Sequence, residues 1–131
     1  MNKHFRILTI CSIFMFYNLS GHAAGKINDN PASVVQAIFS AAKTGNYALL
    51  SGLCNPSQQG DGDTKMICGM SEQNTEVKRE FREQFRTGKI IGKAVIQGDT
   101  ATVKIKFGLQ GKDDEEFRLV RIDGKWYLQG Y

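Results

Sequence analysis

The stretch Gly98-Asp-Thr-Ala-Thr-Val-Lys-Ile-Lys-Phe107 decides the fold class of this 131-residue chain. Two residues that typically close β-hairpins, Gly98 and Asp99, are followed by strict alternation of apolar and polar side chains. A period of two is the pattern of a β-strand with one buried and one exposed face. The apolar members, which are expected to face a core, are Ala101, Val103, Ile105 and Phe107, and the outward members are Thr102, Lys104 and Lys106.

Working outward from this hairpin, the sequence predicts a meander of four antiparallel strands. The first strand covers residues 89–97, and a second turn is expected at 111–114, after the strand that ends at Phe107. The third strand leads to the Asp123-Gly124 turn, and the last covers residues 125–129. The inward positions of the last three strands are Val103, Ile105, Phe107, Phe117, Leu119, Trp126 and Leu128.

Upstream of residue 89 the apolar period is that of helices. Asn30 is placed to cap a first helix that has Pro31 in its first turn, and Gly45 is placed to end it. Two more helices are predicted over residues 47–53 and 75–87, the latter with an apolar stripe of Val77, Phe81 and Phe85. The predicted fold class is therefore α+β, with N-terminal helices packed on one face of a four-stranded antiparallel sheet.

The first 24 residues have the three parts of a bacterial export signal: a basic start, an apolar run over residues 7–17, and small residues at Ala23 and Ala24. The apolar run is shorter than the roughly 20 residues that a membrane-spanning helix needs. A lipoprotein would carry a cysteine where His22 stands. We expect cleavage after Ala23 or Ala24, one domain over residues 25–131, no membrane span after cleavage, and a periplasmic or secreted product.

Loss of the signal limits the chemistry of what remains, because both histidines and Cys11 lie within it. Cys54 and Cys68 are then the only cysteines, and an oxidising compartment favours a disulfide between them. A redox-active pair is the alternative, but redox cysteines are usually two residues apart. The loop between the two cysteines is rich in turn-forming residues, so a structural disulfide is expected to hold it.

The remaining residues predict no catalytic group, cofactor or metal site. Acid–base catalysis lacks a histidine, zinc would be short of ligands, and Asp61-Gly62-Asp63 lacks the distal glutamate of a calcium loop. The acidic run 113–116 is expected on a hairpin turn, hydrated by solvent. Basic and acidic residues are mixed along the chain, which argues against nucleic acid as a partner.

Three segments, residues 31–47, 98–103 and 119–126, resemble those of the NTF2-like superfamily with its cone-shaped, cystatin-like α+β fold. The chain is most similar to the small exported bacterial domains of the DUF4878 and lumazine-binding-like type. The resemblance implies a sheet that curves around a helix-covered pocket, which some members use for catalysis. The inward positions here carry no base, so the resemblance implies the fold without implying an isomerase-like activity.

Two functions are left open, besides a third alternative, an isomerase-like enzyme, for which the inward positions supply no base. One is a non-enzymatic domain that binds a small apolar or acidic ligand between the helices and the sheet, through Phe85, Phe107, Arg121 and Trp126. In that hypothesis Arg121 meets a ligand carboxylate at the pocket mouth; in the competing interpretation Arg121 reaches solvent and Trp126 belongs to the core. The other function is a protein-interaction module, such as a periplasmic antagonist or an envelope-assembly partner. Its docking surface would be the exposed sheet face at Thr102, Lys104, Lys106 and Arg118, and the resemblance also implies a homodimer formed through the sheet.

Overall fold

The computed structural model describes residues 27–57 and 59–131. The predicted signal peptide and its cleavage site lie outside the described residues. The helical elements, in chain order, are the α-helix α2 (Pro31–Thr44), the 3-10 helix η1 (Tyr47–Leu53), α3 (Gly62–Cys68), the 3-10 helix η2 (Met70–Glu72) and α4 (Thr75–Phe85). The strands follow as β1 (Lys89–Ile90), β2 (Val95–Gln97), β3 (Thr100–Phe107), β4 (Asp113–Ile122) and β5 (Lys125–Gly130).

All strand pairs are antiparallel, in the order β1-β3-β4-β5, with β2 also paired to β3. The prediction of one continuous strand over residues 89–97 is wrong. The chain leaves the sheet between Ile90 and Val95, where Gly92 has a left-handed φ of 70°. The sheet therefore has five strands, two of which share one edge of β3.

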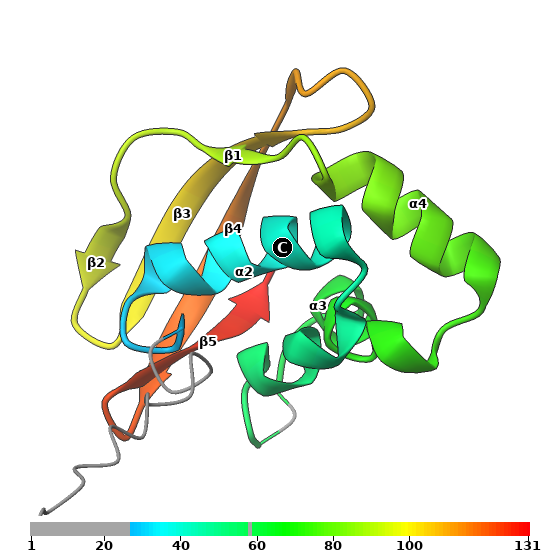
Figure 1. Cartoon of the computed structure of the whole chain (residues 1–131). Coiled ribbons are helices and arrows are strands. Elements are labelled where there is room, and N and C mark those ends of the chain that lie inside the picture. Colours follow the sequence, from blue (N-terminus) through cyan, green and yellow to red (C-terminus); the bar gives the residue numbers. More distant parts are fainter. Residues whose placement is uncertain (1–26, 58) are drawn as a thin grey trace, which may run out of the picture.

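The helices lie on one face of the sheet, with α2 crossing the strands and α4 beside the upper end of β4 (Figure 1). This arrangement confirms the predicted α+β fold class, with the helices packed on one face of an antiparallel sheet. The inward face is also confirmed: every one of its predicted members is buried except Phe107, which is half-buried. The β3–β4 hairpin extends beyond the helices at the top of Figure 1.

Helix α2 begins and ends as its sequence predicts. The Asn30 side chain accepts a hydrogen bond from the Ser33 N–H, and Gly45, with φ of 76°, donates its N–H to the Ala41 carbonyl. Phe39 on the buried face of α2 packs directly on Gly88, where a Cβ atom would overlap the phenyl ring. The lack of a side chain at Gly88 thus lets the α4–β1 connection lie against α2.

Three local predictions are wrong. Residues 62–68 form helix α3, where a loop was expected, and α4 ends at Phe85, two residues before Thr87. The acidic run 113–116 lies in strand β4, because the chain already turns at Gly108, which has φ of 91°. Asp114 consequently pairs with Lys106 across the ladder, with 2.6 Å between Oδ1 and Nζ.

Candidate functional site

A small cleft lies where α3, η2 and α4 meet the end of β5. Its volume is about 200 Å³. The lining residues are Asp63, Met66, Ile67 and Met70 from the α3–η2 segment, Val77, Glu80, Phe81, Gln84 and Phe85 from α4, and Tyr131.

The floor of the cleft is apolar and belongs to the core. Phe81 and Phe85 are each only 5% exposed, and their ring centroids are 5.2 Å apart. Tyr131 closes one side, with its ring 5.7 Å from Phe85 and stacked on Phe117 at 4.8 Å. Such packed rings form a rigid apolar surface that can contact another apolar group.

The polar lining residues include two carboxylates, Asp63 and Glu80, and no Lys or Arg. Carboxylates outside the lining of the cleft add to this negative charge. Burial raises the pKa of the Tyr131 hydroxyl, and the charges of Glu115, Asp63 and Asp113 raise it further. Tyr131 is therefore neutral at physiological pH, and a cation near the cleft is electrostatically favoured over an anion.

Asp61 holds two walls of the cleft together. Its Oδ1 accepts the Thr64 N–H at 2.9 Å, which caps α3, and its Oδ2 accepts the Tyr131 N–H at 3.0 Å. Arg118 lies 3.4 Å from the same Oδ2. Burial alone would raise the pKa of Asp61, but the hydrogen bonds from Thr64 and Tyr131 and the charge of Arg118 together lower it.

Because the pKa of Asp61 is lowered in the folded protein, we expect the free energy of unfolding to decrease at acidic pH. Asp61 contributes fully to stability above the pKa it has in the unfolded chain, ordinarily 3.8, and this contribution is lost as the pH falls through the lower folded-state pKa. We expect Asp61→Ala to lower the free energy of unfolding by about 1 kcal/mol at pH 7, as loss of a helix cap does. Asp61→Asn keeps a capping side chain, so we expect it to remove mainly the acid dependence. Urea unfolding of the three proteins at pH 7 and pH 3 measures this, and an unchanged pH dependence in both variants would show that Asp61 has no such role.

The predicted disulfide is confirmed. Cys54 and Cys68 are bonded, with 6.0 Å between their Cα atoms. Cys68 is the last residue of α3, so the disulfide links the end of this helix to Cys54, which directly follows η1.

The four predicted ligand-binding residues lie in two separate places. Phe85 is in the cleft floor, and Phe107 packs on it with 5.4 Å between ring centroids, without lining the cleft. Arg121 and Trp126 contact one another near the opposite end of β4, where the guanidinium lies 5.2 Å from the Trp126 ring. Arg121 also forms an ion pair with Asp99 at 3.0 Å.

Of the ten residues that line the cleft, only Phe85 was predicted from the sequence as a ligand-binding residue. Val77 and Phe81 were predicted as part of an apolar stripe, and the others were not predicted as site residues: Asp63, Met66, Ile67, Met70, Glu80, Gln84 and Tyr131. Met66, Ile67 and Met70 have helical spacing, and Asp61 precedes them as a potential cap, which is the signal that could have revealed α3.

The sequence of this chain matches a known protein family. The family model of DUF4878, a domain of unknown function, matches residues 23–129. The chain belongs to the DUF4878 family. No curated protein matches it.

Two solved structures are similar to this DUF4878 domain. A SEC-C motif-containing protein from Rhodopseudomonas palustris is 14% identical, with a TM-score of 0.48 over 77% of this chain and 76% of that one. A Campylobacter jejuni protein, provisionally named an NTF2-like transpeptidase, is 17% identical, with a TM-score of 0.49 over 76% of this chain and 97% of that one.

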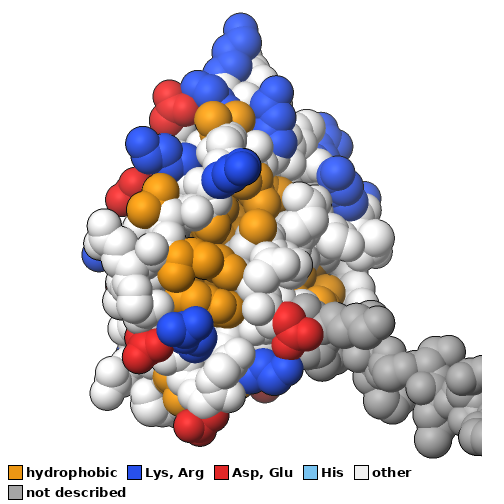
Figure 2. Space-filling model, turned by 90° about the vertical axis from the view of Figure 1, so that its left-hand side faces the viewer, with side chains coloured by type: hydrophobic (Ala, Val, Ile, Leu, Met, Phe, Trp, Pro, Cys, Tyr) orange, Lys and Arg blue, Asp and Glu red, His pale blue; other side chains and the backbone are white. Residues whose placement is uncertain are grey.

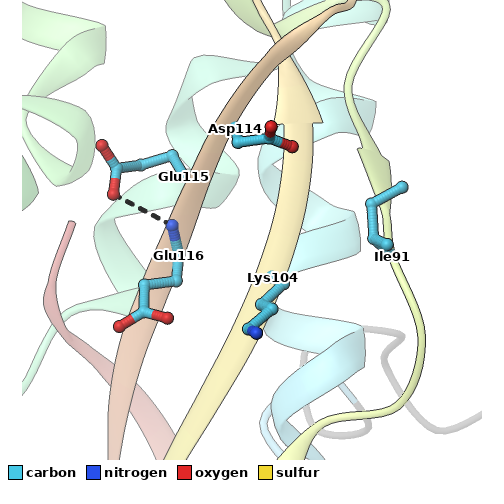
Figure 3. Close-up of a pocket in the computed structure, with 5 residues that line it drawn as sticks. All are labelled: Ile91, Lys104, Asp114, Glu115 and Glu116. Atoms are coloured by element: carbon cyan, nitrogen blue, oxygen red, sulfur yellow. Dashed lines mark hydrogen bonds between the residues drawn. The ribbon is translucent and has the colours of Figure 1, made fainter.

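The DUF4878 domain has a second, shallower depression on its outer sheet face, of about 490 Å³. Figure 3 shows Lys104 on β3, with Ile91 of the β1–β2 connection on one side of it and Glu115 and Glu116 of β4 on the other. Two of the three cations of the predicted docking surface are already paired, Lys106 with Asp114 and Arg118 with Asp61. Much of the charge on this face is therefore balanced within the domain.

The side of the DUF4878 domain that carries β2 exposes an apolar patch. Ile91, Val95 and Ile96 are between 41% and 56% exposed. Figure 2 shows hydrophobic side chains gathered in the middle of this side, with several Lys and Arg side chains above them.

In residues 27–57 and 59–131, no helix has both the length and the apolar composition to span a membrane. Within the same part of the chain, no three His, Cys, Asp or Glu side chains are grouped so that they could hold a metal ion.

Proposed function

We propose that this chain is an exported, non-enzymatic binding domain whose cleft accepts an apolar group that carries a positive charge beside it. The observation that supports this most directly is the lining of the cleft. An apolar floor of Phe81, Phe85 and neighbouring residues is bordered by Asp63 and Glu80, with no basic residue to recognise an anion. The sequence alone left an apolar or an acidic ligand open, and this lining favours an apolar ligand with a cationic group over an acidic one.

The size of the cleft limits what can enter it. Pockets for whole small-molecule ligands are usually 300–1,000 Å³ in volume. A cleft of about 200 Å³ accommodates one aromatic or branched aliphatic group, with the rest of the ligand outside. A ligand with an apolar end and an adjacent ammonium group fits both the floor and the rim.

The chemistry of the lining supports binding over catalysis. Tyr131 has a raised pKa, which makes it a weaker acid and keeps it protonated at neutral pH. A general acid or base works best when its pKa lies near the operating pH. Export is supported by the signal-like first 24 residues and by the Cys54–Cys68 disulfide, which is the kind of bond that persists in oxidising compartments.

The test uses two probes of similar shape and opposite charge, phenethylamine and 3-phenylpropionate, titrated at pH 7 into the oxidised protein and followed by amide NMR. We expect phenethylamine to shift resonances of α3, α4 and Tyr131, and to bind more tightly than the anion. At about 0.5 kcal/mol for each exposed charge, the double variant Asp63→Asn/Glu80→Gln should weaken phenethylamine binding about fivefold.

The matched control is Glu76→Gln. Glu76 lies on α4 but is paired with Arg79 and does not line the cleft, so this change should leave phenethylamine binding within about twofold. Equal binding of the two probes, or shifts confined to the outer sheet face, would refute the proposed function.

The apolar patch at β2 favours a second candidate function, a protein-interaction module. Exposed apolar residues on an edge strand are a common site of pairing with another chain. Sedimentation equilibrium of the wild-type domain tests whether this side pairs two copies.

A further inference from the structure

Strand β4 has a free edge beside the cleft. It is ten residues long, but β5 pairs with it only from Arg118 to Ile122. Residues 113–117 pair with β3 on one edge, and no described strand pairs with their other edge. An unpaired edge presents backbone N–H and C=O groups that another extended chain can bind.

The backbone of Glu116 shows which groups point to this edge. Its N–H donates to the Glu115 Oε1 at 3.0 Å, a local bond that Figure 3 shows as a dashed line. Because backbone groups alternate in direction along an antiparallel strand, the N–H and C=O of Asp114 point the same way as those of Glu116. The local carboxylate thus satisfies one N–H that a neighbouring strand would otherwise satisfy.

The side chains along this edge are acidic on both faces of the sheet. Asp113 to Glu116 are all exposed, and Lys106 is the one cation paired with them by an ion pair in the described residues. Tyr131, which lines the cleft, stacks on Phe117 at the end of this edge with 4.8 Å between ring centroids, so the free edge adjoins the cleft. Asp114 and Glu116 share the outer face, whereas Glu115 shares the inner face with the buried Phe117.

We propose that the free edge of β4 binds an extended peptide segment as an added strand, with basic side chains on its outer face and an apolar side chain in the cleft. Five edge residues span about 17 Å, the length of an ordinary strand. In this binding mode the backbone supplies affinity and alternate side chains supply specificity. The part of this inference that places an apolar side chain in the cleft rests on the proposed function. The part that adds a strand through backbone hydrogen bonds rests on the free edge alone.

A second copy of the chain does not fit this edge. Pairing two β4 edges would place one acidic run opposite another, and like charges directly opposite one another destabilise a sheet. The same charge attracts a basic strand. The acidic edge therefore disfavours pairing of two β4 edges and favours a cationic peptide.

The experiment uses the oxidised full-length mature protein and a pentapeptide with blocked termini, Lys-Phe-Lys-Val-Lys. We expect this peptide to protect the Asp114 and Glu116 amides from hydrogen exchange. We also expect it to bind about tenfold more tightly than the same peptide with alternate backbone nitrogens methylated, and than Glu-Phe-Glu-Val-Glu. Methylation removes backbone hydrogen bonds and keeps the charge, so it separates strand addition from simple attraction.

The protein variants are Glu116→Pro and Glu116→Gln. Proline removes the edge N–H at a position where edge strands tolerate it, so peptide binding should fall about tenfold while phenethylamine binding stays unchanged. Glutamine keeps the N–H and should weaken the peptide by about two- to threefold, as expected for one exposed charge. If Glu116→Pro does not fold, the comparison of the methylated with the unmethylated peptide is sufficient to test strand addition.

The outcomes separate the two proposals. Equal affinity of the methylated and unmethylated peptides, or no protection of Glu116, overturns strand addition even if phenethylamine binds in the cleft. Protection of Glu116 by the peptide supports strand addition even if phenethylamine fails to bind, in which case the proposed cleft function is the one refuted. Protection that appears without peptide and rises with protein concentration identifies a second copy and also overturns this inference.

Discussion

Replacing Phe85 with alanine is expected to lower the free energy of unfolding by about 3–5 kcal/mol and to abolish binding in the cleft. Phe85 is buried and is the centre of the aromatic core. Its ring contacts those of Phe39, Phe81, Phe107, Phe117 and Tyr131, with centroids 5.2–6.5 Å away. Truncation removes a contact to α2, to the sheet and to the cleft wall at once, so the remaining rings lose their common support.

Two variants of the same helix make this result interpretable. Phe85→Leu keeps most of the buried volume and should cost less than about 1.5 kcal/mol. Arg82→Ala changes an exposed residue one turn away and should stay within about 0.5 kcal/mol of wild type. Guanidinium unfolding measures all three, and a loss below about 1 kcal/mol for Phe85→Ala would show that the ring is not central to the core.

The inward face of the sheet could be predicted because it depends on residues that are neighbours in the sequence. Each residue of β3 projects to the face opposite that of its neighbour, so alternation from Ala101 to Phe107 states directly which side chains meet the core. The ends of α2 were equally readable, since a cap at Asn30 and a left-handed residue at Gly45 act through their own neighbours.

The wall formed by α3 carried a local signal, but the cleft as a whole could not be predicted because the meeting of its walls depends on distant contacts. Gly62, Asp63 and Thr64 are poor helix formers, and alone they favour a turn. They begin α3 because Asp61 caps the helix while it also accepts a hydrogen bond from Tyr131, a residue 70 positions away. The helix in turn buries Ile67 against the core. No local pattern in the sequence states that Asp61 and Tyr131 meet.

The strand break and the early turn had a related cause. Gly92, Gly108 and Gly111 all adopt left-handed conformations, but the sequence does not state at which of these glycines a strand ends. Choosing the turn at Gly111 placed the acidic run outside the sheet. The free acidic edge of β4 could therefore not be predicted without the register of β3 and β4.

Removing the disulfide by Cys54→Ser/Cys68→Ser is the second change with a large expected effect, a loss of about 3 kcal/mol in the free energy of unfolding. The bond closes a loop of 14 residues in sequence separation, and a closed loop of this size restricts the unfolded chain by about that amount. The double variant avoids leaving a single reactive thiol. Guanidinium unfolding of the variant, and of the wild type with and without dithiothreitol, measures the loss.

The same variant tells whether the disulfide also shapes the cleft. Helix α3 has other attachments in the folded state: the cap from Asp61 and the buried side chains of Thr64 and Ile67. We therefore expect phenethylamine binding at low temperature to stay within about twofold of wild type, although stability falls, since the bond acts chiefly on the unfolded chain. Loss of α3 amide protection while β3 and β4 stay protected would contradict this, and would make the disulfide a part of the cleft wall. An unchanged stability would contradict the loop-closure argument itself.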